Sequence, residues 1–310
     1  MKIIFMGTPD YAVKTLEAIY GAGHEVAAVF AQPDKPVGRK QILTPPPVKI
    51  CAEKHKTEVY QPESLKNGDA ARIISEIAPD IIVVVAYGKI LPENILNIPR
   101  YGCINGHASL LPLYRGASPI QWCIVKGEKK TGVTVMQMDK GMDTGDILLT
   151  AETEIGSEET AVDLFDRLSV ISAELTVKAL DKIQNGDITP IKQDESKATF
   201  APIIKKEMAH IDFCNMSAEE VHNAVRGYYS WPCAFFIFGG KRVKIIKCTL
   251  GKKTSLPAGT VADSSDVLSV TCGDGIAVNL TELQPEGSKP MTAKQMLCGR
   301  PIAPGTVIKD

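Results

Sequence analysis

Asp80-Ile81-Ile82-Val83-Val84-Val85-Ala86 is the stretch of this 310-residue chain that decides its fold class. Its β-branched residues follow one another without polar alternation, which is typical of a strand covered on both faces in a parallel sheet. A second run, Lys2-Ile3-Ile4-Phe5-Met6, ends at the turn Gly7-Thr8-Pro9-Asp10, and helix-like sequence follows to about residue 20. Strand, helix and strand in this order predict an α/β domain with a doubly wound sheet.

Further β-type runs and one long helix extend this pattern through the first 189 residues. The runs cover residues 25–31, 102–106, 132–138 and 146–153. Residues 160–183 place apolar side chains at helical spacing, which predicts a long amphipathic helix. We therefore expect residues 1–189 to form one domain.

The sequence changes character after residue 189. Residues 190–205 are polar and contain two prolines, which predicts a linker. One helix, at about 217–227, and a series of short β-type runs follow, at 234–238, 241–249, 258–262, 267–272 and 275–283. Gly239-Gly240 between two of these runs is a hairpin signal. Short strands at this spacing predict a small β-barrel over residues 206–310.

Composition excludes several classes of protein. The net charge is −1, so the chain as a whole is not polybasic. The longest strictly apolar run, residues 81–87, is far shorter than the roughly 20 residues that a membrane-spanning helix needs. The first residues also lack the apolar stretch of a secretory signal. We expect a cytoplasmic protein that does not enter membranes, and a monomer, because no surface stripe typical of an obligate dimer is evident.

Cysteine and histidine spacing gives no indication of a metal site. The eight cysteines form no C-x-x-C pair, and the five histidines show neither H-x-x-x-H nor H-E-x-x-H. Reduced thiols and no structural zinc are therefore expected. The turn at residues 7–10 matches neither G-x-G-x-x-G nor the phosphate-binding P-loop, so no nucleotide cofactor is indicated.

Asn105, His107 and Asp143 are the residues most suited to chemistry. Asn105 and His107 end a predicted strand two residues apart, so both can face one cleft. Asp143 lies in the Asp- and Gly-rich loop 139–146. The three could combine acid–base catalysis with an oxyanion donor. Equally, His107 could be a core histidine and Asp143 a turn residue. No Ser, Cys or Lys beside them indicates a covalent intermediate.

The same block carries a resemblance to a known family. Asn105-Gly106-His107-Ala108-Ser109-Leu110-Leu111-Pro112, followed by Gly141-Met142-Asp143-Thr144-Gly145-Asp146, resembles the signature of the 10-formyltetrahydrofolate-dependent formyltransferases. One departure is Gly106, where relatives usually carry Val or Ile. Stretches outside the block resemble the branch that acts on methionyl-tRNA, so that the likeness spans essentially the whole chain; they are residues 6–12, 32–40, 132–139, 211–213, 231–232 and 283–291.

The resemblance implies a fold, a reaction and catalytic roles. It implies a Rossmann-like catalytic domain and a small OB-like β-barrel that helps to hold tRNA. The reaction would move the formyl group of 10-formyltetrahydrofolate, a consumed co-substrate, to the α-amine of initiator methionyl-tRNA for translation initiation, without a metal. Asn105 would donate to the oxyanion, His107 would stabilise the intermediate and share proton transfer, and Asp143 would orient His107 and accept a proton.

It also implies two sets of binding residues. The folate contacts would be Val84, Ala86, Tyr87, Gly88, Ile90, Ser109, Leu110, Leu111 and Pro112. A basic loop with Arg39 and Lys40 would reach the tRNA. Residues 236–257 contain basic residues and no acidic one, which fits either a solvated hairpin face or a platform for phosphates. We expect Lys241, Arg242, Lys244 and Lys247 of this stretch to contact tRNA.

Two other functions compete with this one. A formyltransferase that acts on an amino-sugar nucleotide would keep Asn105, His107 and Asp143, so these residues do not discriminate. A tRNA-binding module without catalysis would fit the basic hairpin and the small barrel. The basic loop at 33–40 and the stretch 283–291 favour the tRNA enzyme, and the trio argues against a pure binder.

Overall fold

The computed structural model describes residues 1–38 and 40–308, which form two compact units. Unit 1 comprises Met1–Pro119, Lys130–Glu154 and Phe165–Ala201. Unit 2 comprises Ile120–Lys129, Ile155–Leu164 and the chain from Pro202 onward. The division into domains at 1–189 and 206–310 stays a prediction. The compact units separate at Ala201 and Pro202, and unit 2 also includes two short earlier segments.

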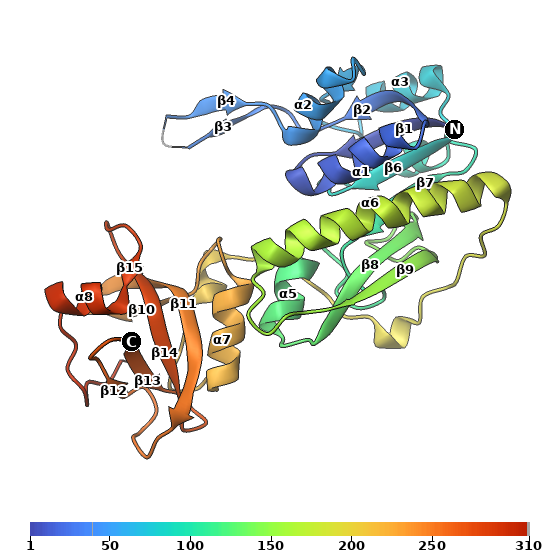
Figure 1. Ribbon diagram of the computed structural model, residues 1–310. Coiled ribbons are helices and arrows are strands. Elements are labelled where there is room, and N and C mark those ends of the chain that lie inside the picture. The colour runs from blue at the N-terminus through green and yellow to red at the C-terminus, as the bar shows by residue number, and fades with distance from the viewer. Residues whose placement is uncertain (39, 309–310) are drawn as a thin grey trace. The chain divides into compact units, whose positions relative to one another are not determined.

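Unit 1 is built on a seven-stranded sheet with the order β5-β2-β1-β6-β7-β8-β9 (Figure 1). The strands are β1 (Lys2–Gly7), β2 (Glu25–Phe30), β5 (Val59–Tyr60), β6 (Ile81–Val85), β7 (Cys103–His107), β8 (Lys130–Gln137) and β9 (Ile147–Glu154). The first five in this order pair in parallel, whereas β8 and β9 are antiparallel. The Rossmann-like α/β class is confirmed, but the sheet is mixed. The alternating exposure along β9 is typical of an antiparallel edge strand.

Helices cover both faces of this sheet, which explains the uninterrupted apolar sequence of β6. All five residues of β6 are buried. Ile4, Met6, Ile82 and Val84 pack in a core with residues of α3 (Asp69–Ile77) and α4 (Glu93–Leu96). On the other face lie α1 (Asp10–Gly21) and α6 (Ala161–Asn185), whose Tyr11 and Phe165 rings meet edge to face at 5.2 Å.

A hairpin and a short helix interrupt the first half of unit 1. Strands β3 (Lys35–Val37) and β4 (Ile42–Thr44) pair in antiparallel fashion and project from the sheet in Figure 1. Val37, Ile42 and Leu43 expose more than half of their surface there. Helix α2 (Pro47–Lys54) begins at a proline, which suits the first turn of a helix because its missing N–H would have no partner there.

Unit 2 contains a curled antiparallel sheet with the order β10-β11-β14-β13-β12, and β15 pairs with β14. The strands are β10 (Phe235–Phe238), β11 (Lys241–Lys253), β12 (Val261–Asp263), β13 (Leu268–Thr271), β14 (Ile276–Pro285) and β15 (Met291–Thr292). Helices α5 (Pro119–Val125), α7 (Ala218–Gly227) and α8 (Ala293–Gly299) complete the elements named here. The small barrel-like domain is confirmed, in the form of a half-barrel: among the described strands, no ladder joins β10 to β12. Within residues 1–38 and 40–308, no helix combines the length and apolar character that crossing a membrane requires.

Candidate active site

The structure brings Asn105, His107 and Asp143 together at the carboxyl end of β7. Asn105 Nδ2 lies 3.5 Å from Asp143 Oδ1, and His107 Nδ1 lies 3.7 Å from Asp143 Oδ2. Val84 of β6 pairs in register with Asn105, so the cluster sits at the edge where parallel strands end and where open α/β sheets bind ligands. One carboxylate therefore faces both an amide and an imidazole.

The contacts of His107 determine which ring nitrogen is free for chemistry. Its Nε2 lies 3.0 Å from the carbonyl oxygen of Tyr114. A carbonyl oxygen can only accept, so Nε2 carries a hydrogen and donates it. Nδ1 is then the nitrogen that faces Asp143. The imidazole is buried, as that of a core histidine would be. Its Nδ1 nevertheless faces the Asp143 carboxylate, an arrangement that a purely structural histidine does not need.

The backbone around Asp143 is held in place by Gly116. The N–H of Gly116 donates to Asp143 Oδ2 at 2.8 Å, and Asp143 itself has a left-handed φ of 55°. Gly116 has a φ of 116°, and a Cβ there would lie 2.9 Å from the carbonyl oxygen of Ala201. Only glycine fits this position without displacing the backbone, so it fixes the orientation of the Asp143 carboxylate.

Sequence reasoning missed a polar network that supports the Asp143 loop. Gln193 Nε2 donates to the carbonyl oxygens of Asp143, at 2.8 Å, and Gly145, at 2.7 Å. Arg115, whose surface is 2% exposed, donates to Gln193 Oε1 and to both carboxylate oxygens of Glu195. Hydrogen bonding to Glu195 raises the pKa of Arg115, and hydrogen bonding from Arg115 lowers the pKa of Glu195. Gln193 and Glu195 belong to no sequence motif.

Part of the segment expected to be a linker therefore belongs to this site. Thr199 accepts the N–H of Tyr114 with its hydroxyl, at 2.8 Å, and that of Arg115 with its carbonyl, at 2.9 Å. Ala201 donates its N–H to the carbonyl oxygen of Arg115 at 2.7 Å. Residues 193–201 thus hold residues 114–116 on one side and the Asp143 loop on the other.

Gly106, between Asn105 and His107, packs against helix α6. A Cβ at this position would lie 2.8 Å from Ser172 Oγ and 3.5 Å from Val85 Cγ2. The close approach of α6 leaves no room for a Val or Ile side chain with Ser172 in its present position. The glycine is therefore matched to the neighbouring helix and leaves the register of Asn105 and His107 intact.

The loop after β6, where folate contacts are expected, is held in place by hydrogen bonds to the backbone of Tyr87. The carbonyl oxygen of Tyr87 accepts from Thr8 Oγ1 at 3.1 Å and from Gln32 Nε2 at 3.0 Å. The Tyr87 side chain is 1% exposed, and burial raises its pKa to about 12. Ile90, by contrast, is 73% exposed. Tyr87 therefore anchors the loop in the core, and its ring is not open to a ligand.

The other residues that are expected to contact folate also include both buried and exposed positions. Val84 is buried in the core, whereas Ala86 and Gly88 are exposed on the loop. In the segment 109–112, Ser109 and Leu111 are buried and Leu110 and Pro112 are half-buried. Ser109 donates to the carbonyl oxygen of Leu113 at 2.6 Å, so its hydroxyl serves the segment itself.

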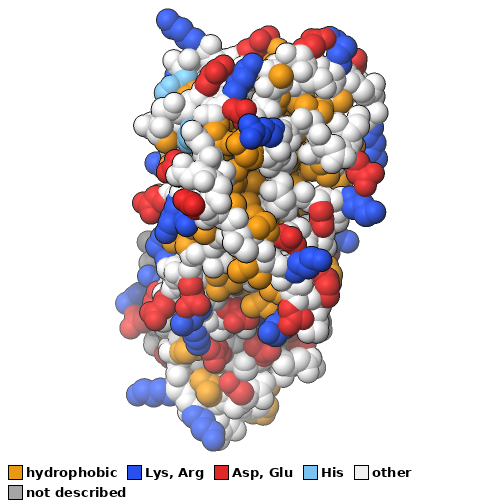
Figure 2. All heavy atoms as spheres, turned by 90° about the vertical axis from the view of Figure 1, so that its right-hand side faces the viewer, with side chains coloured by type: hydrophobic (Ala, Val, Ile, Leu, Met, Phe, Trp, Pro, Cys, Tyr) orange, Lys and Arg blue, Asp and Glu red, His pale blue; other side chains and the backbone are white. Residues whose placement is uncertain are grey.

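The residues expected to contact tRNA are distributed over both units. Arg39 lies outside the described residues, and Lys40 is exposed beside the β3–β4 hairpin. Arg242 and Lys244 stand two residues apart on β11 and so share one face, and Arg242 lies over the Phe235 ring at 3.9 Å. Lys241 is exposed at the start of this strand. Lys247 pairs in register with the acidic Glu282. Figure 2 shows basic and acidic side chains interspersed over the face that it draws.

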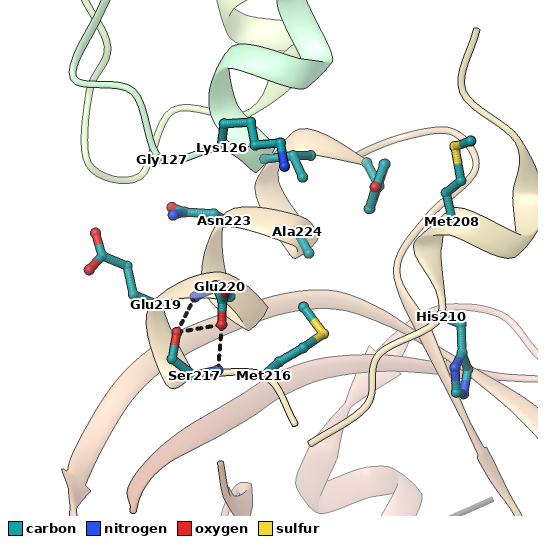
Figure 3. A pocket seen from close by; sticks show the side chains of 12 residues that line it. Lys126, Gly127, Met208, His210, Met216, Ser217, Glu219, Glu220, Asn223 and Ala224 are labelled. Atoms are coloured by element: carbon teal, nitrogen blue, oxygen red, sulfur yellow. Dashed lines mark hydrogen bonds between the residues drawn. The ribbon is translucent and has the colours of Figure 1, made fainter. Parts of the chain in front are cut away.

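A pocket of about 570 Å³ lies in unit 2 (Figure 3). Lys126, Met208, His210 and Asn223 are among its lining residues. The first turn of α7 borders it, but Ser217 and Glu220 close that turn with a capping box. The capping box occupies the N–H groups of Ser217 and Glu220, and Asp274 accepts the N–H of Ala218, so most donors of this helix start already have a partner.

Comparison with solved structures gives the same fold. An N-formyltransferase from Helicobacter canadensis, in complex with folinic acid and dTDP-3-aminofucose, superposes with a TM-score of 0.69 at 21% identity over 92% of this chain and 99% of that one. HypX from Aquifex aeolicus, in complex with tetrahydrofolic acid, has a TM-score of 0.62 at 17% identity. That match covers 96% of this chain and 47% of the HypX chain.

Sequence comparison is more specific. Residues 1–180 match the model of the formyl transferase family, and residues 203–301 match that of the formyl transferase C-terminal domain. A methionyl-tRNA formyltransferase of Geobacter metallireducens is 46% identical over 98% of this chain and 97% of its own length. One from Alkaliphilus oremlandii is 45% identical over the full length of both chains. This chain therefore belongs to the formyl transferase family, among the methionyl-tRNA formyltransferases.

Proposed function

We propose that this chain transfers the formyl group of 10-formyltetrahydrofolate to the α-amine of initiator methionyl-tRNA, as a cytoplasmic monomer. The meeting of Asn105, His107 and Asp143 around one carboxylate carries the proposal. The match to methionyl-tRNA formyltransferases along the whole chain selects the acceptor. The cytoplasm is where initiator tRNA is charged and used, so the reaction belongs there.

The formyl carbon becomes tetrahedral during the transfer. The neutral α-amine attacks this carbon, a C–N bond forms, and the electron pair of the C=O bond moves to the oxygen. Asn105 Nδ2, a neutral amide donor at the strand end, would donate to that oxyanion. Donors preorganised at such a position are among the largest contributions to catalysis of acyl transfer. Collapse of the intermediate then breaks the bond to N10 of the folate.

Two protons must move for the reaction to balance. The attacking nitrogen loses one, and N10 gains one as it leaves. Asp143, the one carboxylate of the trio, accepts the proton from the amine, directly or through water. His107 Nδ1 faces the same carboxylate, so the imidazole stabilises the intermediate and takes part in delivering a proton to N10. The Tyr114 carbonyl keeps the ring in the orientation that this requires.

The folate would bind along the strand ends. The exposed loop residues Ala86, Gly88 and Ile90 offer backbone groups and an apolar wall, which a pterin ring needs. Leu110 and Pro112 would form the opposite wall. Val84, Tyr87, Ser109 and Leu111 are buried, so we assign them to shaping these two walls from behind.

Phosphates of the tRNA would be held by basic residues of both units. We assign this role to Arg39, to Lys40 beside the β3–β4 hairpin, and to Lys241, Arg242, Lys244 and Lys247 on β11. Within the second set, Arg242 and Lys244 share a strand face, whereas Lys247 stands opposite Glu282. Arg242 and Lys244 should therefore contribute most.

The double change Arg242→Ala and Lys244→Ala is expected to raise KM for the tRNA while leaving KM for the folate unchanged. Each lost phosphate contact should reduce the slope of log affinity against log salt by about 1, so the double variant should lose about 2. Lys178→Ala, an exposed lysine on α6, is the control and should leave the slope as it is. A double variant with the slope of the unchanged chain would remove β11 from the tRNA-binding surface.

Gln193→Ala is expected to lower kcat by about ten- to a hundredfold, because a small displacement of a catalytic group has effects of that size. The change frees the carbonyl groups of Asp143 and Gly145 from their shared donor. KM for both substrates should stay the same, because Gln193 is a positioning residue. Gln193→Glu, which keeps the size but cannot donate, should behave alike, and Lys192→Ala is the exposed neighbouring control. Unchanged kcat in both Gln193 variants would show that the Asp143 loop holds its position without this support.

The function itself is tested by offering acceptors in parallel. Labelled 10-formyltetrahydrofolate is supplied with initiator methionyl-tRNA, with a dTDP- or UDP-linked amino sugar, or with both. Formylated methionyl-tRNA as the sole product supports the proposal. Product only on the sugar would keep the fold and the trio but replace the acceptor. Bound tRNA without transfer to either acceptor would favour a tRNA-binding module.

A further inference from the structure

A group of metal-binding side chains lies outside the active site, on helices α1 and α2 of unit 1. Cys51 and His55 stand one helical turn apart on α2 and at its end, so they share a face. Glu17 lies on the facing helix α1. One donor atom from each of the three lies within 4.8 Å of the others. The motifs C-x-x-C and H-x-x-x-H do not include this group, because it combines C-x-x-x-H with a ligand from another helix.

The distances within the group are close to those of a tetrahedral zinc site. Cys51 Sγ lies 3.2 Å from Glu17 Oε1, and His55 Nε2 lies 3.1 Å from Glu17 Oε2. Zinc binds S, N and O ligands at about 2.0–2.3 Å, which places two ligands of a tetrahedron about 3.3–3.8 Å apart. These two distances go to different oxygens of the Glu17 carboxylate, so a tetrahedral site needs the carboxylate to turn until one oxygen faces both Cys51 and His55. A thiolate, an imidazole and a carboxylate form a set suited to Zn²⁺ rather than to Mg²⁺ or Ca²⁺.

A neighbouring aromatic residue holds the imidazole in place. The Tyr20 ring stacks on the His55 ring with centroids 3.9 Å apart and planes 10° apart. The Tyr20 hydroxyl is fixed in turn by a hydrogen bond of 2.6 Å to Thr57 Oγ1. Such partners of the ligands orient a metal site and tune its affinity. Glu17 and His55 are exposed and Cys51 is buried beneath them, so an ion can enter from solvent.

A catalytic role for the same three residues is disfavoured. The Cys51 thiol donates to the Glu17 carboxylate. A nucleophilic cysteine needs an adjacent base to take its proton, typically an imidazole, whereas one Glu17 carboxylate accepts from Cys51 and also faces His55. The arrangement therefore fits a ligand set better than an activated thiol.

We propose that Glu17, Cys51 and His55 bind one Zn²⁺ ion, with water as the fourth ligand, and that the ion joins α1 to α2. On binding, the S–H bond of Cys51 breaks, the proton passes to solvent, and the Zn–S bond forms. The ion is structural and takes no part in formyl transfer. This proposal differs from the expectation of no structural zinc, which rested only on the spacing of cysteines and histidines along the sequence.

The position of the site suggests what the ion would stabilise. Only Pro45 and Pro46 separate helix α2 from the β3–β4 hairpin. Its first turn is tied to the active-site edge by a hydrogen bond from the N–H of Val48 to the carbonyl oxygen of Thr8. Zinc at the other end of α2 would fix the helix at both ends and so give the hairpin a rigid base.

The test uses the full chain, stripped of metal under reducing conditions and titrated with Zn²⁺ in a calorimeter. We expect one tight site per chain. Each of Glu17→Gln, Cys51→Ser and His55→Gln should weaken it by more than the roughly 10- to 100-fold that the loss of a supporting residue costs. Cys298→Ser and Glu53→Gln, an exposed thiol and an exposed carboxylate of α2 outside the group, should leave the affinity unchanged.

Two further measurements distinguish a loss of zinc binding from a folding defect in the variants. Co²⁺ in place of Zn²⁺ should give a thiolate charge-transfer band that Cys51→Ser abolishes. Zn²⁺ should raise the Tm of the unchanged chain but not of Glu17→Gln, which keeps the side-chain size and the acceptor for Cys51. Zinc binding of equal affinity in the chain and in Glu17→Gln, or a Co²⁺ complex without the thiolate band, would overturn the proposal. Both readouts are independent of formyl transfer.

Discussion

Replacement of Asp143 by Asn is expected to lower kcat for formyl transfer by about 10²–10⁴-fold, the usual contribution of a positioned acid–base group. The amide has nearly the same size and can still accept the N–H of Gly116, so the loop keeps its shape. It cannot accept a proton from the amine, and it places no negative charge beside His107 Nδ1. Single-turnover transfer with saturating folate and tRNA measures this step directly.

Asp139→Asn is the matched control for this experiment. Asp139 lies in the same loop, where its Oδ1 accepts from the N–H of Gly141 at 2.9 Å and from Thr144 Oγ1 at 2.7 Å. An Asn oxygen keeps both bonds, so kcat should remain within a few fold. A loss below about tenfold in Asp143→Asn would show that another group accepts the proton. A loss as large in Asp139→Asn would mean that loop geometry, and not the carboxylate, had been tested.

Asn105→Ala is expected to reduce kcat by about 10²–10³-fold, because the loss of one oxyanion donor typically lowers kcat by this factor. The amide is needed when charge develops on the formyl oxygen, and it adds little to binding of the ground state. KM for folate and for tRNA should therefore hardly change. A pre-steady-state assay that separates transfer from product release gives the measurement.

Asn97→Ala supplies the comparison for this second variant, because Asn97 is an exposed asparagine at the end of α4. Its kcat and Tm should match those of the unchanged chain. If Asn105→Ala raised KM for the folate and left kcat alone, Asn105 would be a binding residue and the oxyanion would need another donor.

The sequence predicted the core strands well because burial on both faces leaves a strong pattern. The runs at 2–6 and 81–86 became β1 and β6, and the helix expected at 160–183 became α6. The hydrophobic pattern did not indicate the direction of each strand. The runs at 132–138 and 146–153 form β8 and β9, whose antiparallel pairing depends on the intervening loop and on the edge position rather than on hydrophobicity.

The candidate site was predictable where its residues share one element or one motif. Asn105 and His107 lie two apart on a strand, and Asp143 stands in a loop of distinctive composition, so their meeting could be expected. Gln193 and Glu195 could not be found in this way. Each is a common polar residue in a segment without periodicity, and its partner lies about 50 to 80 residues away in the chain. Such pairings arise from the tertiary fold alone.

The course of residues 193–201 bears on how the catalytic half could be isolated as a fragment. A truncation after residue 189 removes Gln193, Glu195 and Thr199, so Arg115 becomes a buried guanidinium without its acceptors and the Asp143 loop loses its support. A fragment that ends at Ala201 keeps every one of these bonds. To keep the Asp143 loop supported, a catalytic fragment therefore has to extend twelve residues beyond residue 189, where the sequence predicted that the catalytic domain ends.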